Sequence, residues 1–227
     1  MKRLFFFLPV LITLLLASSG YSQSAKSVAL DSPKDQKPRN VKAEPVQYKG
    51  RKALRVTDDA PPNSSDDDRY LMLTATDFKN GVIEIELAGD TMPNASAAAR
   101  GFVGITFRTA TDGSKFECFY LRPTNGRADD QVRRNHSTQY ISHPDFPWQK
   151  LRKEFPEKYE SYVDLVPGEW TKVKIEVAGT KARLYVHGAS QPALIVNDLK
   201  LGESSGAIGL WVGPGTVAHF SNLRVSK

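Results

Sequence analysis

From residue 41 to the C-terminus, the sequence is a series of short stretches in which apolar and polar residues alternate. This is the pattern of half-buried β-strands, because successive side chains of a strand point to opposite faces. The clearest stretch is VKIEV at residues 173–177, and further stretches occupy residues 53–56, 70–73, 82–87, 102–108, 116–121, 182–186, 207–211 and 218–225. Turn residues such as Asp112-Gly113 separate them. The pattern predicts an all-β chain that forms a sandwich or a barrel.

The first residues have the composition of a secretory signal peptide. Lys2 and Arg3 are positive, and an apolar run follows over residues 4–17. This run is shorter than the roughly 20 apolar residues that a spanning helix needs. We therefore predict a signal peptide at residues 1–23 and export to the periplasm or beyond the cell, with no membrane span after cleavage.

The rest of the chain suits one domain. Residues 24–40 are polar, include two prolines and show no periodicity, which indicates a flexible leader. Residues 41–227 are the predicted β-domain. Cys118 is the only cysteine, so the domain depends on a large core rather than on internal disulfides, and we expect Cys118 to be a buried, inert thiol.

The charge pattern argues against a nucleic-acid partner. The net charge is +6, and Lys2 and Arg3 leave with the signal peptide. Lysines and glutamates mostly alternate along the strands, as on a solvated sheet face, and they form no basic stripe.

One long segment, residues 123–167, interrupts the series of strands. It is polar and aromatic, with a predicted short strand at residues 138–141 and a helical turn at residues 148–153. Ordered connections of this length usually carry function, so we expect the site here.

Several motifs carry a family resemblance. The strand GEWTKVKIEV at residues 168–177 is followed by GAIGLW at 206–211 and AHFSNLRV at 218–225. This order resembles laminin-G-like and related concanavalin A-like domains. The resemblance implies a two-sheet antiparallel jelly-roll sandwich with one long loop excursion.

Within that superfamily, FKNGVIEIEL at residues 78–87, GITFR at 104–108 and Phe116-Glu117 resemble the bacterial 3-keto-disaccharide hydrolase-like family, often labelled family 16 glycoside hydrolase-like. The resemblance implies recognition of a carbohydrate outside the cytoplasm, with cleavage of 3-keto or plain di- or oligosaccharides as one activity. A non-catalytic carbohydrate-binding module and a laminin-G-like protein-binding module remain open alternatives.

The usual catalytic acids of a glycosidase are absent. The E-x-D-x-x-E motif of family 16 does not occur, and Glu84 and Glu86 are interpreted as a solvated strand face. In a 3-keto sugar the carbonyl acidifies the neighbouring proton, so one base and one cation suffice. The candidates are Glu117 or His136 as base and Arg108 or Arg122 as cation.

These catalytic candidates have competing interpretations. Glu117 and Arg122 have opposite strand parity, so they share a groove only if a bulge or turn intervenes. A structural salt bridge between Arg108 and Glu117 is an equally good interpretation. The predicted ligand-binding residues, chosen for amide, guanidinium and aromatic chemistry, are Tyr120, Arg122, Asn125, Arg127, Gln139, Tyr140, His143 and Trp148.

No metal-binding residues are predicted. His136 and His143 lack a clear third ligand for zinc. The run Asp66-Asp67-Asp68 permits a structural calcium site, with an acidic surface turn as the alternative. We expect no other cofactor.

Overall fold

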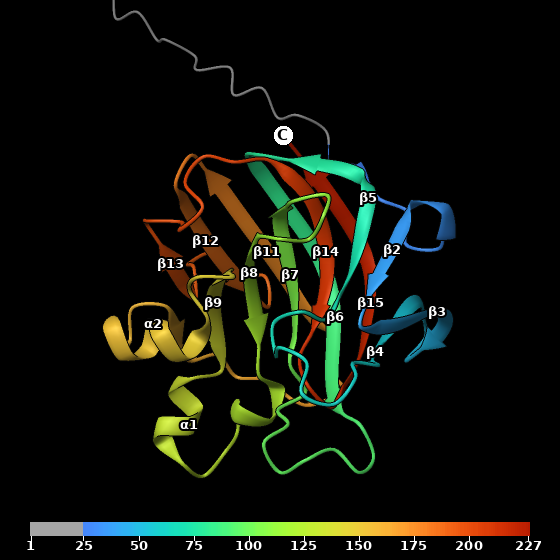
Figure 1. Ribbon diagram of the computed structural model, residues 1–227. Helices are drawn as coiled ribbons and strands as arrows, with labels where there is room; N and C mark the ends of the chain where they lie inside the picture. The colour runs from blue at the N-terminus through green and yellow to red at the C-terminus, as the bar shows by residue number, and fades with distance from the viewer. Residues whose placement is uncertain (1–24) are drawn as a thin grey trace, which may run out of the picture.

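The computed structural model describes residues 25–227, so the predicted signal peptide lies outside the described part of the chain. These residues form two antiparallel β-sheets that pack face to face, with short helices at one end (Figure 1). The predicted two-sheet sandwich is therefore confirmed.

Sheet A contains eight strands. In spatial order they are β13 (Leu194–Val196), β12 (Lys181–Val186), β11 (Thr171–Ala178), β6 (Gly81–Thr91), β15 (Thr216–Ser226), β4 (Arg51–Asp58) and β3 (Val41–Tyr48), with β1 (Lys26–Ser27) paired to β15.

Sheet B contains seven strands. In spatial order they are β10 (Glu160–Ser161), β9 (Thr138–His143), β8 (Phe116–Leu121), β7 (Val103–Thr109), β14 (Gly206–Val212), β5 (Tyr70–Phe78) and β2 (Gln36–Arg39).

The helices are short and connect strands at the edges. The α-helices are α1 (Gln131–Asn135) and α2 (Trp148–Glu154), and the 3-10 turns are η1 (Pro33–Asp35) and η2 (Pro123–Asn125). The predicted strand at residues 138–141 and helical turn at residues 148–153 are thus present as β9 and α2, whereas α1 was not predicted.

The core lies between the sheets and follows the alternation of the sequence. Ile175 on β11 is fully buried, and its neighbours Lys174 and Glu176 are only half-buried on the outer face of sheet A. Cys118 is a free thiol and fully buried, and burial raises its pKa, so the expectation of an inert thiol is confirmed.

The N-terminal leader differs from the prediction. Lys26 pairs with Val225 through β1, and Gln36 pairs with Leu73 through β2, so the described part of residues 24–40 is paired to both sheets. Alternation is missing here because β2 is an exposed edge strand, a position that also tolerates Pro38.

The face of sheet B that points away from sheet A positions the candidate site. The strand register brings Tyr70, Trp211, Gly104, Tyr120 and Gln139 into one row across this face. We call it the outer face of sheet B. Two loops, residues 59–69 and 110–115, lie in front of it in Figure 1.

Arg39 joins these two loops. Its guanidinium pairs with the carboxylate of Asp68 and donates a hydrogen bond of 3.1 Å to the carbonyl of Asp112. One part of the outer face is therefore covered by the protein's own loops.

Candidate functional site

A cavity of about 620 Å³ lies at the part of the outer face that the loops leave accessible. Its walls come from the loops 59–69 and 92–102, from the segment after β8 and from α2. The lining residues are Asp66, Asp67, Ser96, Ala98, Ala99, Arg100, Phe102, Tyr120, Arg122, Asn125, Asp130, Val132, Arg133, His136, Trp148, Arg152, Trp211 and Pro214.

Aromatic rings form the floor of the cavity. Tyr120 on β8 and Trp211 on β14 have ring centroids 4.6 Å apart, and Phe102 meets Tyr120 edge-on at 6.1 Å. Trp148 adds a fourth ring from the start of α2. Such surfaces give a ligand a large apolar contact area at low entropic cost.

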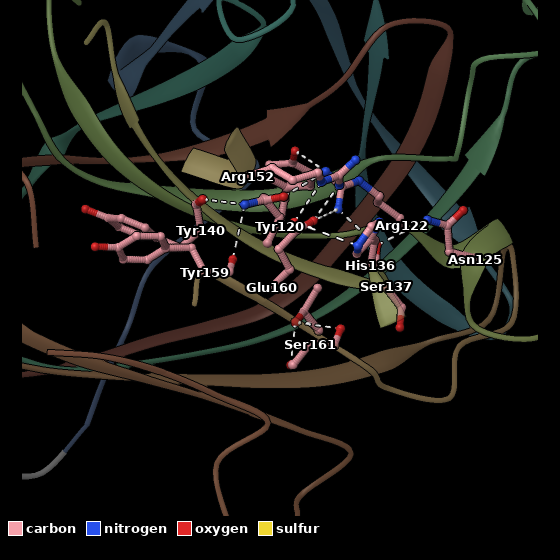
Figure 2. A network of polar contacts seen from close by, with 12 residues as sticks. Tyr120, Arg122, Asn125, His136, Ser137, Tyr140, Arg152, Tyr159, Glu160 and Ser161 are labelled. Atoms are coloured by element: carbon pink, nitrogen blue, oxygen red, sulfur yellow. Dashed lines mark hydrogen bonds and ion pairs between the residues drawn. The ribbon is translucent and has the colours of Figure 1, made fainter. Parts of the chain in front are cut away.

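Arg122 is the centre of the polar network beside this floor (Figure 2). Its guanidinium donates to the hydroxyl of Tyr120 at 2.9 Å and to the side-chain oxygen of Gln139 at 3.0 Å. It also donates to the backbone carbonyl of His136 at 2.9 Å. These fixed bonds hold the cation in place, so it needs no reorganisation to act on a ligand.

Glu160 on β10 supplies the counter-charge. Its carboxylate accepts two hydrogen bonds from Arg152 and lies 3.5 Å from Arg122 (Figure 2). The Glu160 side chain is almost completely buried. Such a buried pair is costly to break, because removal of one partner leaves an uncompensated charge. Sequence reasoning missed Glu160 and Arg152, which lie in a run of ordinary surface-like charges.

His136 lies at the end of α1 and lines the cavity with its ring half-buried. Burial lowers the pKa of His136, although Glu160 at 3.9 Å acts in the opposite direction. The imidazole is therefore neutral near pH 7 and can accept a proton.

Asp67 faces these groups from the loop 59–69. Asp67 is only 7% exposed, and within residues 25–227 its carboxylate accepts no hydrogen bond from the protein. Burial, with a smaller contribution from Asp66, raises the pKa of Asp67 to about 6. The Asp67 oxygens are not fully enclosed, so they border the cavity and can accept hydrogen bonds from a ligand there. The sequence drew attention to this run only as a calcium candidate.

The three consecutive aspartates do not converge on one point. Asp67 lines the cavity, whereas Asp68 binds Arg39 and accepts from Asn40. Over residues 25–227, no group of three or more histidine, cysteine, aspartate or glutamate side chains is arranged to hold a metal ion.

Glu117 and Arg108 lie elsewhere, at the opposite end of sheet B. Glu117 is 0% exposed and faces the core, where its carboxylate accepts from the Tyr140 hydroxyl at 2.5 Å and from the Leu201 amide at 2.9 Å. Burial raises the pKa of Glu117 against the opposing effect of these bonds. Both oxygens are occupied, so the expectation that Glu117 acts as a catalytic base facing a groove is corrected.

Arg108 is also enclosed, at 1% exposure. Its backbone has φ of 53°, and a bulge between β7 and β14 interrupts the alternation at this point. The guanidinium donates to the carbonyls of Lys79, Gly179 and Gly202 at 2.7–3.0 Å. Arg108 therefore ties three loops together and makes no salt bridge with Glu117, so the expected catalytic role of Arg108 is also corrected.

The remaining predicted residues divide between the cavity and the scaffold. Asn125 lines the cavity and accepts a hydrogen bond from Arg133 at 2.9 Å. Gln139 supports Arg122 without lining the cavity. Arg127 pairs with Asp164 on the exposed surface.

Tyr140 and His143 are structural side chains. Tyr140 bonds to Glu117 in the core, and His143 stacks on Phe116 with ring centroids 4.9 Å apart. The structure thus unites Tyr120, Arg122, Asn125, His136 and Trp148 in one cavity. It adds Asp67, Arg100 and Trp211, which come from loops and strands distant in sequence.

Within residues 25–227, no helix is long and apolar enough to cross a membrane. No protein-family model matches the chain, and no curated protein sequence matches it.

Solved structures share its fold. The carbohydrate binding module CBM66 from Bacillus subtilis superposes with a TM-score of 0.55 at 13% identity, covering 85% of this chain and 96% of that module. A protein of unknown function with a galectin-like fold from Bacillus subtilis gives 0.54 at 12% identity, covering 89% of this chain and 97% of that protein. This likeness shows the fold, a concanavalin A-like jelly roll, as the resemblance implied.

Proposed function

We propose that this protein binds a carbohydrate in the cavity on the outer face of sheet B. One observation carries the proposal: four aromatic side chains and a set of charged side chains converge in one space of about 620 Å³. This volume is within the range of small-molecule sites, which combine apolar walls with a few oriented polar groups.

The two kinds of side chain suit the two kinds of surface on a sugar. The half-buried rings of Phe102 and Trp148 offer apolar surface to the C–H groups of a sugar ring, above the buried rings of Tyr120 and Trp211. The half-buried guanidinium of Arg100 and the carboxylate of Asp67 offer a donor and an acceptor for hydroxyl groups, and the charge of Arg122 lies beside them. CBM66, which shares the fold, is a carbohydrate binding module, and this supports the proposal.

The test is a binding screen of the purified protein on a glycan array, followed by calorimetry with each positive sugar. Phe102→Ala removes a half-buried ring from the cavity and should weaken binding about tenfold or more. The matched control is Tyr162→Ala, because Tyr162 is 44% exposed and lies outside the cavity. Binding that is equal in both variants, or absent for every sugar, contradicts the proposal and leaves a protein partner as the alternative.

A second candidate function is cleavage of 3-keto disaccharides, and the shared position of His136 and Arg122 favours it. Both side chains line the cavity, and Arg122 donates to the His136 backbone carbonyl. Neutral His136 would take the proton beside the keto group. The charge of Arg122 would stabilise the enolate oxygen, and the enolate would expel the glycosidic oxygen, which takes the proton back from His136. Water would then add to the double bond, with its hydroxyl group on C1 and its proton on C2.

This candidate is tested by sugar release from plain and 3-keto disaccharides. His136→Gln should abolish release while the folded protein still binds. His143→Gln is the matched control, because His143 packs on Phe116 outside the cavity. Release that persists in His136→Gln rules out His136 as the base.

We further propose that the protein acts outside the cytoplasm. Lys2, Arg3 and the apolar run at residues 4–17 support export. Cell fractionation of the full chain and of a chain without residues 1–23 tests it: only the full chain should leave the cytoplasm.

A further inference from the structure

Three arginines gather at one wall of the cavity. Arg100 comes from the loop before β7, Arg122 follows β8, and Arg133 lies in α1. Arg122 has Glu160 nearby, but within residues 25–227 Arg100 and Arg133 make no salt bridge with any carboxylate. Asp130 also lines the cavity, but it accepts from the backbone amide of Arg133 and forms no ion pair with the guanidinium, so an anion in the cavity would neutralise the repulsion among these arginines.

The neighbouring positive charges act on the pKa of Arg100. Burial lowers the pKa of Arg100, and the charges of Arg133 and Arg122 lower it further. The Arg100 side chain is only half-buried, so it is held near the other two cations although solvent is within reach.

Both arginines line the cavity and retain guanidinium N–H groups that make no hydrogen bond within residues 25–227. Arg100 donates through Nη1 to the carbonyls of Ala97 and Ala99, and its Nε and Nη2 make no hydrogen bond within residues 25–227. Arg133 donates through Nε and Nη2 to Asn125 and Thr124, and its Nη1 makes none in the same part of the chain. These local bonds fix the planes of the guanidinium groups and leave N–H groups for an acceptor.

The wall contributed by the loop 59–69 has the opposite character. Asp67 presents a buried carboxylate without a protein donor, and a carboxylate of this kind accepts hydrogen bonds from hydroxyl groups. A ligand that satisfies both walls needs an anionic group at one end and hydroxyls at the other, with apolar surface for the half-buried rings of Phe102 and Trp148.

We propose that the preferred ligand is a sugar acid, whose carboxylate binds the Arg100 and Arg133 wall and whose hydroxyls donate to Asp67. The proposal rests on carbohydrate binding at this same cavity. Arginine suits this task because its planar fork matches the geometry of a carboxylate.

The experiment compares each ligand with a neutral counterpart. Calorimetry at low salt measures the affinity of tetrasaccharides of glucuronic, galacturonic and mannuronic acid, each beside its carboxyl-reduced form. At least one acid should bind about tenfold or more tightly than its reduced form, and the difference should shrink as salt is added.

Variants assign that preference to the wall. Arg100→Gln and Arg133→Gln should each remove most of the preference for the acid, measured as the ratio of the affinities for the acid and for its reduced form. Arg183→Gln is the matched control, because Arg183 is an exposed arginine on β12. Arg100→Gln alone suffices if Arg133→Gln fails to fold, since the known bonds of Arg100 are made only to neighbouring carbonyls.

The experiment distinguishes failure of the sugar-acid proposal from failure of carbohydrate binding. Reduced forms that bind as tightly as the acids overturn the sugar-acid proposal and leave carbohydrate binding intact. No binding of either form, or of any other sugar, overturns both. A preference for acids that Arg100→Gln does not change also overturns the assignment to this wall.

Discussion

The indole nitrogen of Trp211 donates a hydrogen bond of 2.8 Å to the backbone carbonyl of Asp67. This bond joins the aromatic floor of the cavity to the loop that carries the unpartnered carboxylate. The Trp211 side chain therefore fixes the position of the loop 59–69 relative to the aromatic floor.

Trp211→Phe should loosen this loop. Phenylalanine keeps an aromatic ring at this position but has no indole N–H group, so the buried carbonyl of Asp67 loses its donor. The free energy of unfolding should therefore fall by about 2 kcal/mol. Ligand affinity should fall as well, since the Asp67 carboxylate is no longer fixed. Urea unfolding and calorimetry measure the two effects. Trp148→Phe is the control, because the indole nitrogen of Trp148 makes no hydrogen bond within residues 25–227. Equal losses in both variants would contradict this account.

Asp67→Asn should change how stability depends on pH. The pKa of Asp67 is raised to about 6, so the folded state holds the proton more tightly than the unfolded chain does. Its contribution to stability is present below about pH 4 and is lost as pH rises through 6. The wild type should therefore lose on the order of 2 kcal/mol relative to Asp67→Asn between pH 4 and 7. Urea unfolding across this pH range measures the free energy of unfolding of both proteins. If the two free energies change in parallel with pH, the prediction is contradicted.

His219 should act in the opposite direction over the same range. Its ring stacks on Tyr48 with centroids 3.5 Å apart, and burial lowers its pKa to about 4. Its contribution is present above about pH 6.5 and is lost as pH falls through 4. His219→Phe keeps the stacked ring without the proton, so this variant should lose less stability in acid than the wild type does. Thermal unfolding at pH 7 and pH 4.5 provides the comparison.

Arg108→Gln should destabilise the fold without altering the cavity. It leaves the carbonyls of three loops without their donor, so we expect a loss of about 3 kcal/mol or more. Ligand affinity of the folded protein should remain unchanged, because Arg108 lies at the other end of sheet B. Denaturant unfolding and calorimetry test both statements. A selective loss of binding would restore the original assignment of Arg108 to the site.

Calcium removal should leave stability unchanged. The Asp68 carboxylate is already paired with Arg39, so the acidic run offers no converging set of free oxygens. Thermal unfolding with and without a calcium chelator measures this, and a lower melting temperature with the chelator would contradict it.

Alternation made the long strands predictable. Residues 173–177 lie in β11, where buried and more exposed side chains alternate, whereas residues 116–121 lie in β8, which is buried on both faces and reads as a continuous apolar run. The short edge strands β2, β10 and β13 were missed, because strands of two to four residues have too few side chains to show a period.

The candidate site was predictable only where one segment supplies it. His136 and Trp148 belong to the long polar excursion, whose length indicated a site, and Arg122 leads directly into it. Asp67 and Arg100 come from other loops, and only the packing of sheet B brings them close. Alternation could not show the structural position of Arg108, because the bulge and the φ of 53° that place its guanidinium against three loop carbonyls leave no pattern in the sequence.

Arg39 holds two loops across the outer face of sheet B and covers it beyond Asp68. These contacts fix the boundary of the accessible part of this face, so we expect the proposed ligand to approach the cavity from the side that the two loops leave open.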